Sequence, residues 1–239
     1  MRWWWALAGV LALSWPATAG ADDWRDLELG IGVLGQVGGN FIDRPEDVAV
    51  TPGNPVELVY PGFGGLGGGG GLSLDLRYKK FIGVQMDLML SSDRGVGYID
   101  LLRVSIGQTS IHVPIMAKLL YPGDTVRPSI ALGVDFIAPQ SLEITTDPLL
   151  PSTATLFGSQ ASAHAMIVGA IGVEFLLPYE GADLRIPVSI RGGINPSTPD
   201  AARDRAAYVL DGTLVRSVIF DSAWQYHLSF NIGVSYFLF

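Results

Sequence analysis

Three histidines are the residues in this sequence best suited to acid–base chemistry. Two of them, His112 and His227, lie two positions from a serine, Ser110 and Ser229 respectively. A serine beside a histidine and an acid is the arrangement of serine hydrolases. Both pairs share the parity that we assign below to a barrel interior, where they would be polar filling. We therefore expect no catalytic residue, no cofactor and no metal site.

A run of glycines suggests a second chemistry, nucleotide binding. Gly62, Gly64 and Gly67 match the dinucleotide motif G-x-G-x-x-G. That motif needs a helix after it, because the pyrophosphate sits on the helix N-terminus. Here residues 72–79 alternate apolar and polar side chains, which is the period of a strand. We interpret the glycines as positions where a sharply coiled sheet needs room.

The N-terminus has the features of an export signal. Arg2 precedes an apolar run to Trp15, and Ala17-Thr18-Ala19 supplies small residues for cleavage. We predict a signal peptide over residues 1–19 and a single mature domain over residues 20–239.

The composition narrows the class of this exported chain. Cysteine is absent, which rules out a disulfide framework and a thiolate metal site, and the net charge of −8 disfavours nucleic acid. Apolar residues make up 49% of the chain, charged residues only 16%, and the mean hydropathy is +0.35. Its apolar surface therefore needs surroundings other than water. No stretch after residue 19 approaches the roughly 20 apolar residues of a membrane helix, which leaves a closed β-barrel.

Alternating apolar and polar residues predict eight strands. They lie near residues 26–38, 67–79, 81–91, 105–120, 125–137, 163–177, 182–194 and 223–238. Short turns at 79–80, 121–124 and 178–181 alternate with long segments at 39–66, 92–104, 138–162 and 195–222. This order predicts an all-β fold, an eight-stranded antiparallel up-and-down transmembrane β-barrel. In the long segments we expect strand extensions over 138–162 and a short helix from Pro199 to Leu210.

Four segments resemble a known group of proteins. They are SIHVPIMAKLLYP (110–122), RPSIALGVDF (127–136), RIPVSIRGGIN (185–195) and LSFNIGVSYFLF (228–239). They resemble small outer-membrane β-barrels of Gram-negative bacteria, including the OmpA-like transmembrane domain and porin-like families. The resemblance implies a location in the bacterial outer membrane, in contact with its lipid and lipopolysaccharide. The C-terminal segment resembles the signal read by the outer-membrane assembly machinery, although its apolar face ends on Leu238 and Phe239 has the opposite parity.

The opposite parity of the strands predicts a charged lumen. The predicted network comprises Glu28, Asp75, Arg77, Asp87, Lys118, Asp135, Glu174, Arg185 and Arg191. With Lys79 added, acids and bases are equal in number, and unpaired buried charges are costly, so they should pair. An eight-stranded barrel is just wide enough for side chains to fill. We expect a plugged barrel with a structural or surface-interaction role and an unknown surface ligand. The alternatives are a narrow porin-like channel, a lipid A-modifying enzyme, or a soluble lipocalin-like ligand-binding barrel.

Aromatic residues near the predicted strand ends suggest two girdles at the membrane interfaces. We assign Tyr78, Phe81, Tyr121, Tyr179, Phe237 and Phe239 to the turn side, and Trp224 and Tyr226 to the loop side. Ordinary core aromatics are the alternative interpretation.

Overall fold

A computed structural model of the chain describes residues 26–42, 58–59, 63–99, 102–146, 163–179, 182–197, 203–210, 213–221 and 224–238. The expected signal peptide and Phe239 lie outside these residues. Among the described residues, no helix is long and apolar enough to cross a bilayer.

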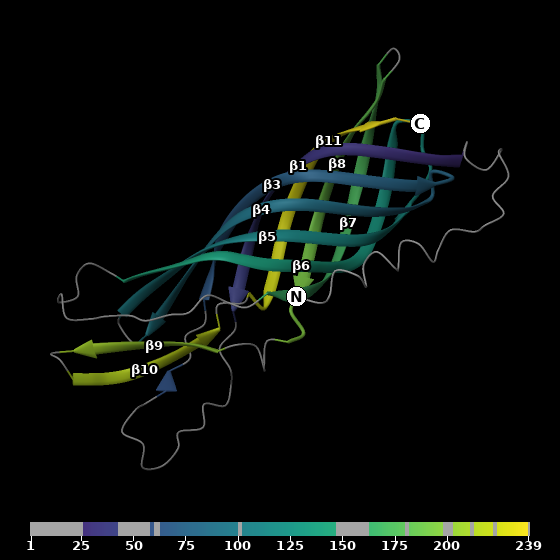
Figure 1. Cartoon of the computed structure of the whole chain (residues 1–239). Coiled ribbons are helices and arrows are strands. Elements are labelled where there is room, and N and C mark those ends of the chain that lie inside the picture. Colours follow the sequence, from purple (N-terminus) through teal and green to yellow (C-terminus); the bar gives the residue numbers. More distant parts are fainter. Residues whose placement is uncertain are drawn as a thin grey trace.

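Eight long strands close into one barrel (Figure 1). They are β1 (Leu27–Ile42), β3 (Phe63–Tyr78), β4 (Ile82–Ile99), β5 (Leu102–Leu120), β6 (Val126–Thr146), β7 (His164–Tyr179), β8 (Ala182–Ile194) and β11 (Tyr226–Phe237). The order around the barrel is β1-β11-β8-β7-β6-β5-β4-β3, and every neighbouring pair is antiparallel. The predicted eight-stranded antiparallel up-and-down barrel is confirmed.

The alternation in the sequence sets which face of each strand is apolar. On β4 the outward residues from Ile82 to Leu90 are 42% to 55% exposed, and the polar Ser92 and Arg94 follow them. On β11 exposed and buried residues alternate from Leu228 onward. The barrel therefore presents an apolar belt to its surroundings and turns its polar residues inward.

Short turns join the strands at one end, which we call the turn end. Between β3 and β4 the Phe81 amide donates to the Tyr78 carbonyl at 3.2 Å, and the central residues Lys79 and Lys80 have φ angles of 52° and 59°. Two positive φ angles define a type I′ hairpin turn. This tight turn fixes the register that places Tyr78 opposite Ile82.

Strands β4, β5 and β6 run beyond the barrel wall at the opposite, loop end. Strand β7 begins at His164 opposite Ile137, whereas β6 continues to Thr146 and pairs there with β5. A register shift between Thr109 and Ser110 marks a β-bulge at the base of this extension. The expected strand extension is confirmed over residues 138–146.

A second, three-stranded sheet lies beyond the loop end (Figure 1). Its strands are β2 (Leu58–Val59), β9 (Arg203–Leu210) and β10 (Thr213–Asp221), in the order β2-β10-β9. The expected helix from Pro199 to Leu210 is therefore wrong. Leu210 pairs with Thr213 across Asp211-Gly212, and Asp-Gly is a strong hairpin signal that outweighs the local capping residues Thr198 and Pro199.

The glycine run lies in β3, where the strand continues to Tyr78 in place of the helix that a nucleotide motif needs. A Cβ atom added at Gly71 would lie 1.9 Å from the Leu88 carbonyl oxygen, and one at Gly69 would lie 2.3 Å from the Leu90 oxygen. The backbones of β3 and β4 approach too closely there for any side chain. These glycines thus lie where the sheet leaves no room for a side chain, which agrees with the expected need for room.

Candidate functional site

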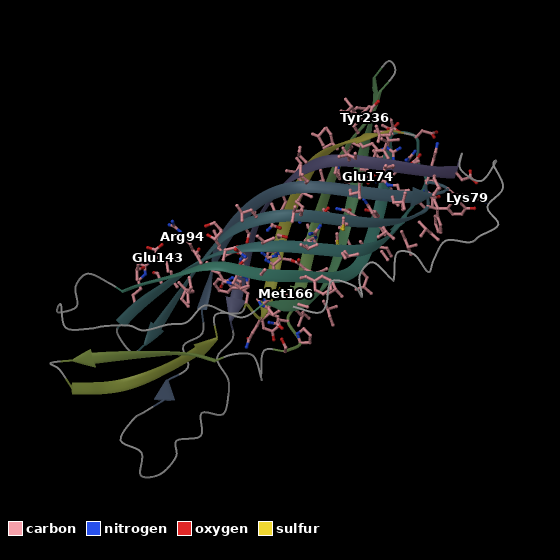
Figure 2. The ribbon with its side chains drawn as sticks, viewed as in Figure 1. Lys79, Arg94, Glu143, Met166, Glu174 and Tyr236 are labelled. Atoms are coloured by element: carbon pink, nitrogen blue, oxygen red, sulfur yellow. The ribbon has the colours of Figure 1, made fainter. Side chains whose placement is uncertain are left out.

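The nine residues of the predicted charge network all lie inside the barrel. Each of them is at most 7% exposed. They separate into two groups along the barrel axis, one near the turn end and one toward the loop end. In Figure 2, Glu174 lies toward the same end as Lys79, while Arg94 and Glu143 lie toward the other.

The turn-end cluster is centred on Arg77 of β3. Its guanidinium donates to Glu174 of β7 through both terminal nitrogens, with Nη1 at 2.7 Å from Oε2. The same guanidinium donates to Asp75 from Nε at 3.0 Å and from Nη2 at 2.5 Å. Lys118 Nζ of β5 adds contacts to Glu174 at 2.7 Å and to Asp75 at 3.2 Å. Arg77 and Lys118 therefore each contact both carboxylates, so every charge in this part of the cluster has two partners of opposite sign.

A second part of the turn-end cluster surrounds Glu28 of β1. Arg185 Nη1 donates to Glu28 Oε2 at 2.9 Å, and Arg127 Nη1 lies 3.9 Å from the same oxygen. Phe237 joins the two parts, because its ring lies 3.5 Å from the Arg185 guanidinium carbon and 4.3 Å from that of Arg77. Phe237 is 4% exposed, so its earlier placement in a girdle is wrong. It shares the inward parity of β11 and forms part of the interior.

Three ion pairs of the charge network, one of them from the loop-end cluster, span the full width of the barrel. Arg77–Glu174 joins β3 to β7, Asp87–Arg191 joins β4 to β8, and Glu28–Arg127 joins β1 to β6. Each pair of strands is four positions apart in the eight-membered order, which is diametrically opposite. Side chains that meet across a diameter obstruct the lumen at that level.

The loop-end cluster begins with Asp87 and Arg191. Arg191 Nη2 donates to Asp87 Oδ2 at 2.8 Å, and Gln85 Nε2 donates to Asp87 Oδ1 at 2.9 Å. Asp87 is fully buried and forms the only ion pair of Arg191 within the described residues.

Above this pair, a chain of hydrogen bonds follows the barrel wall from β11 to β6. His227 Nδ1 contacts Asn40 Oδ1 at 2.6 Å, and Asn40 Nδ2 donates to Asp93 Oδ1 at 2.7 Å. Ser91 then donates to Asp93 Oδ2 at 2.7 Å and lies 2.9 Å from His112 Nε2. With the contact from His112 to Asp135 of β6, this series of hydrogen bonds links residues of five strands and passes over β3.

This series of hydrogen bonds contains a serine, a histidine and an acid in contact with one another. His112 Nε2 faces Ser91 Oγ, and His112 Nδ1 faces Asp135 Oδ2 at 2.8 Å, as in a catalytic triad. The hydroxyl of Ser91 has one proton, however, and in this geometry that proton goes to Asp93. A proton directed at Asp93 is not directed at His112 Nε2, as the activation of a serine nucleophile requires. Ser91 is also only 1% exposed, so the surrounding side chains enclose its hydroxyl.

Several lumen residues were missed because the predicted strands were too short or incompletely read. Ser91 and Asp93 continue the inward parity of Asp87 along β4, and Asn40 continues that of Glu28 along β1. Arg127 shares the parity of Asp135 on β6 and was overlooked. Lys79 was wrongly counted inside, since its side chain is 59% exposed in the turn and lies 3.7 Å from Asp26. The serines beside the histidines, Ser110 and Ser229, contact Gln108 and Asn231 instead.

The aromatic residues divide between the two faces. Tyr78, Phe81, Tyr121 and Tyr226 are 42% to 72% exposed on the outside. Trp224 is only 2% exposed, so its assignment to the loop-side girdle is wrong. It precedes the first residue of β11, where the strict alternation of the strand has not yet begun. The side chains of Tyr179 and Phe239 lie outside the described part of the chain.

A cavity of about 40 Å³ separates the two clusters in the lumen. Lys118 and Glu174 line it toward the turn end, and Gln85 and Arg191 line it toward the loop end. Within the described residues, no cluster of histidine and acidic side chains has the arrangement of a metal site.

The comparisons with known proteins bear on the fold. No protein-family model and no curated protein sequence matches the chain. Among solved structures, the outer membrane protein OprG from Pseudomonas aeruginosa is similar, with a TM-score of 0.52, 10% identity, and coverage of 88% of this chain and 95% of OprG. Neisserial surface protein A gives a TM-score of 0.41 at 8% identity, with coverage of 87% and 96%. Outer Membrane Protein W of E. coli gives 0.31 at 14%, with coverage of 84% and 96%. The similarity to OprG shows that the chain has the fold of an eight-stranded outer-membrane barrel.

Proposed function

We propose that this chain is an integral outer-membrane protein of a Gram-negative bacterium whose lumen is closed by charged side chains. It would act as a rigid anchor that presents its loop end to the outside, not as a transporter or a catalyst. The observation that carries the proposal is the set of three ion pairs across the barrel diameter. The structural similarity to the outer membrane protein OprG supports the location.

The outer face of the barrel supports insertion into a membrane. The apolar belt on β4 covers residues 82–90, nine positions, and a membrane-spanning strand needs about 9–11 tilted residues. Tyr78, Phe81 and Tyr121 lie where an interfacial girdle would be on the turn side. Outer-membrane lipid and lipopolysaccharide are the proposed surroundings of this belt, and the C-terminal strand is the proposed contact for the assembly machinery.

The loop end is the proposed interaction surface. The extension of β4, β5 and β6 and the β2-β10-β9 sheet both lie at this end (Figure 1). Because a plugged lumen gives solutes no passage through the barrel, any interaction is expected to take place at these elements of the loop end.

Heat-modifiable gel migration tests the location. A folded barrel in the outer-membrane fraction should migrate faster without boiling than after boiling. A periplasmic protein without a heat shift would contradict the proposal and favour the lipocalin-like alternative.

Conductance in planar bilayers tests the closed lumen. The purified protein should give no steady single-channel current, whereas regular open levels would favour the narrow porin-like channel. Mass spectrometry of lipid A from expressing cells should show no change, and a lost or gained acyl chain would favour the enzyme.

A further inference from the structure

Three successive cross-strand pairs on the outer face of β4 and β5 mark the loop-end edge of the apolar belt. From the belt outward they are Leu90–Ile111, Ser92–Thr109 and Arg94–Gly107. The first pair is apolar, the second carries two hydroxyls, and the third carries a guanidinium. From Leu90 to Arg94 the outer face thus changes from apolar side chains to hydrogen-bond donors.

The donors of these outer pairs are not used within the described part of the protein. There, the side chains of Ser92, Arg94 and Thr109 form neither a hydrogen bond nor an ion pair. The four arginines inside the barrel, in contrast, each contact a carboxylate: Arg77, Arg127, Arg185 and Arg191. Since Ser92 and Arg94 are exposed, their donors are available to a group outside the barrel.

Glycines on the neighbouring strands leave space beside these donors. Gly68 of β3 lies opposite Ser92, and a Cβ atom built there would contact only the Gln36 carbonyl oxygen among the described residues, at 3.2 Å. A Cβ atom at Gly107 would contact only Glu143 of β6, at 3.7 Å and beyond. Figure 2 shows Arg94 and Glu143 at this end of the barrel. A ligand on the outer face therefore meets no described side chain at either glycine except that of Glu143.

The height of Arg94 above the belt matches the headgroup layer of a bilayer. Arg94 lies four residues beyond Leu90, which is about 13 Å along the strand at roughly 3.3 Å per residue. With a strand tilt of about 35–45°, its Cα atom lies about 10 Å above the edge of the belt. The headgroup layer extends about 5–8 Å beyond the hydrocarbon core, and the long stem of an arginine can bend back along apolar surface to reach it.

We propose that Ser92, Arg94 and Thr109 form a binding site for a phosphate group of lipopolysaccharide, which we call the phosphate site. The guanidinium supplies charge-assisted hydrogen bonds to phosphate oxygens, and the two hydroxyls supply neutral ones. The end of a barrel with the long loops faces the outside of the cell, so the lipid at this height belongs to the outer leaflet. The proposal rests on the outer-membrane location proposed above and adds which residues hold the glycolipid.

Titration with lipid A tests the phosphate site, because its phosphates can be removed without changing its acyl chains. The folded protein in detergent is titrated with diphosphoryl lipid A, with dephosphorylated lipid A or with phosphatidylglycerol, and native mass spectrometry counts the bound lipid. The wild type should bind diphosphoryl lipid A most tightly. Arg94→Gln should weaken that binding about tenfold, the loss expected of one hydrogen bond to a charged group, and leave dephosphorylated lipid A unaffected. Ser92→Ala/Thr109→Val should weaken it about fivefold.

Arg103→Gln is the matched control for Arg94→Gln. Arg103 is also an exposed arginine without an ion pair among the described residues, but it lies opposite Tyr98, four residues farther along β4 than Arg94. That places it about 10 Å higher, roughly one screening length, so its loss should change the affinity by less than about twofold. Glu143→Gln should strengthen the binding of lipid A, because it removes the negative charge across Gly107 from Arg94.

Three outcomes would overturn the phosphate site. Equal losses for Arg94→Gln and Arg103→Gln would show that only the overall charge matters. Equally tight binding of phosphatidylglycerol would mean that the site takes any anionic lipid, and unchanged binding by Arg94→Gln would mean that the lipid is held elsewhere. In each case a heat shift in the outer-membrane fraction would leave the proposed location standing. A wild type without that shift would contradict the location and the phosphate site together.

Discussion

The side chain of Asp93 on β4 passes over Gly67 of β3 and contacts Asn40 on β1. A Cβ atom at Gly67 would lie 2.0 Å from Asp93 Oδ1, the oxygen that accepts from Asn40. We expect Gly67→Ala to displace Asp93 and break this bond, which lowers the free energy of unfolding by about 1–3 kcal/mol. Urea unfolding in lipid vesicles measures this change in the free energy of unfolding. Gly35→Ala is the matched control, since its Cβ would have ordinary contacts at 3.8 Å, and equal losses would contradict the explanation.

The pair Arg77–Glu174 allows a second test at the level of single residues. Arg77→Met alone leaves Glu174 and Asp75 with Lys118 as the only other cation in the described part of the chain that contacts them, and such a loss costs about 3–5 kcal/mol. Arg77→Met/Glu174→Leu removes both charges and leaves Lys118 paired with Asp75, so the double variant should recover much of that loss. A double-mutant cycle of unfolding free energies checks this. Additive losses would show that the two side chains are not coupled.

At this scale, residue parity predicts which side chains enter the lumen but not which of them meet. Alternation within a strand places Glu28, Asp75 and Glu174 inside, because period two is a local property. Contacts between β3 and β7 depend on the number of strands and on how each strand is staggered against the next. Ser91–His112 was missed for the same reason, since its two residues come from separate strands whose register the sequence did not reveal.

Among the elements, the turn between β3 and β4 uses residues that its backbone disfavours. Lys79 and Lys80 both have positive φ angles, where Asn-Gly is preferred in type I′ turns. We expect Lys79→Asn/Lys80→Gly to raise the free energy of unfolding by about 1 kcal/mol, because backbone strain of this kind costs about that much or more per residue. The loss of the exposed Lys79–Asp26 contact should matter little. Lys80→Ala, which keeps a Cβ, is the control, and an equal gain there would contradict the strain argument.

The eight barrel strands were predictable in number and order but not in length. Apolar alternation marks a strand only where one face meets an apolar environment, so it fades beyond Leu90 on β4 while the strand continues to Ile99. The alternation therefore did not predict the ends of β1 and β4 at the loop end. The β9–β10 hairpin was missed because the capping residues before it were given more weight than its Asp-Gly turn.

For the whole molecule, the apolar belt and the polar interior reverse the usual arrangement of a soluble domain. Leu132, Ile171 and Leu66 are more than 60% exposed, whereas Arg77 and Asp87 are almost fully buried. Water cannot stabilise such a surface, and a bilayer can. The closed hydrogen-bonded order of eight strands leaves no edge within the barrel wall, which is the second condition for lipid exposure.

Insertion into a bilayer makes a prediction that depends on depth. Leu132 is 66% exposed within the apolar run of β6, and Leu66 is 74% exposed on β3 beyond the belt, next to the pair Gly67–Asp93. We expect Leu132→Arg to cost about 2–4 kcal/mol near the midplane and Leu66→Arg about 0–1 kcal/mol near the interface. Unfolding in lipid vesicles measures both. In a soluble barrel both positions would face water, and neither arginine would cost much stability. Equal and small changes in the free energy of unfolding at the two positions would therefore contradict a membrane-embedded belt.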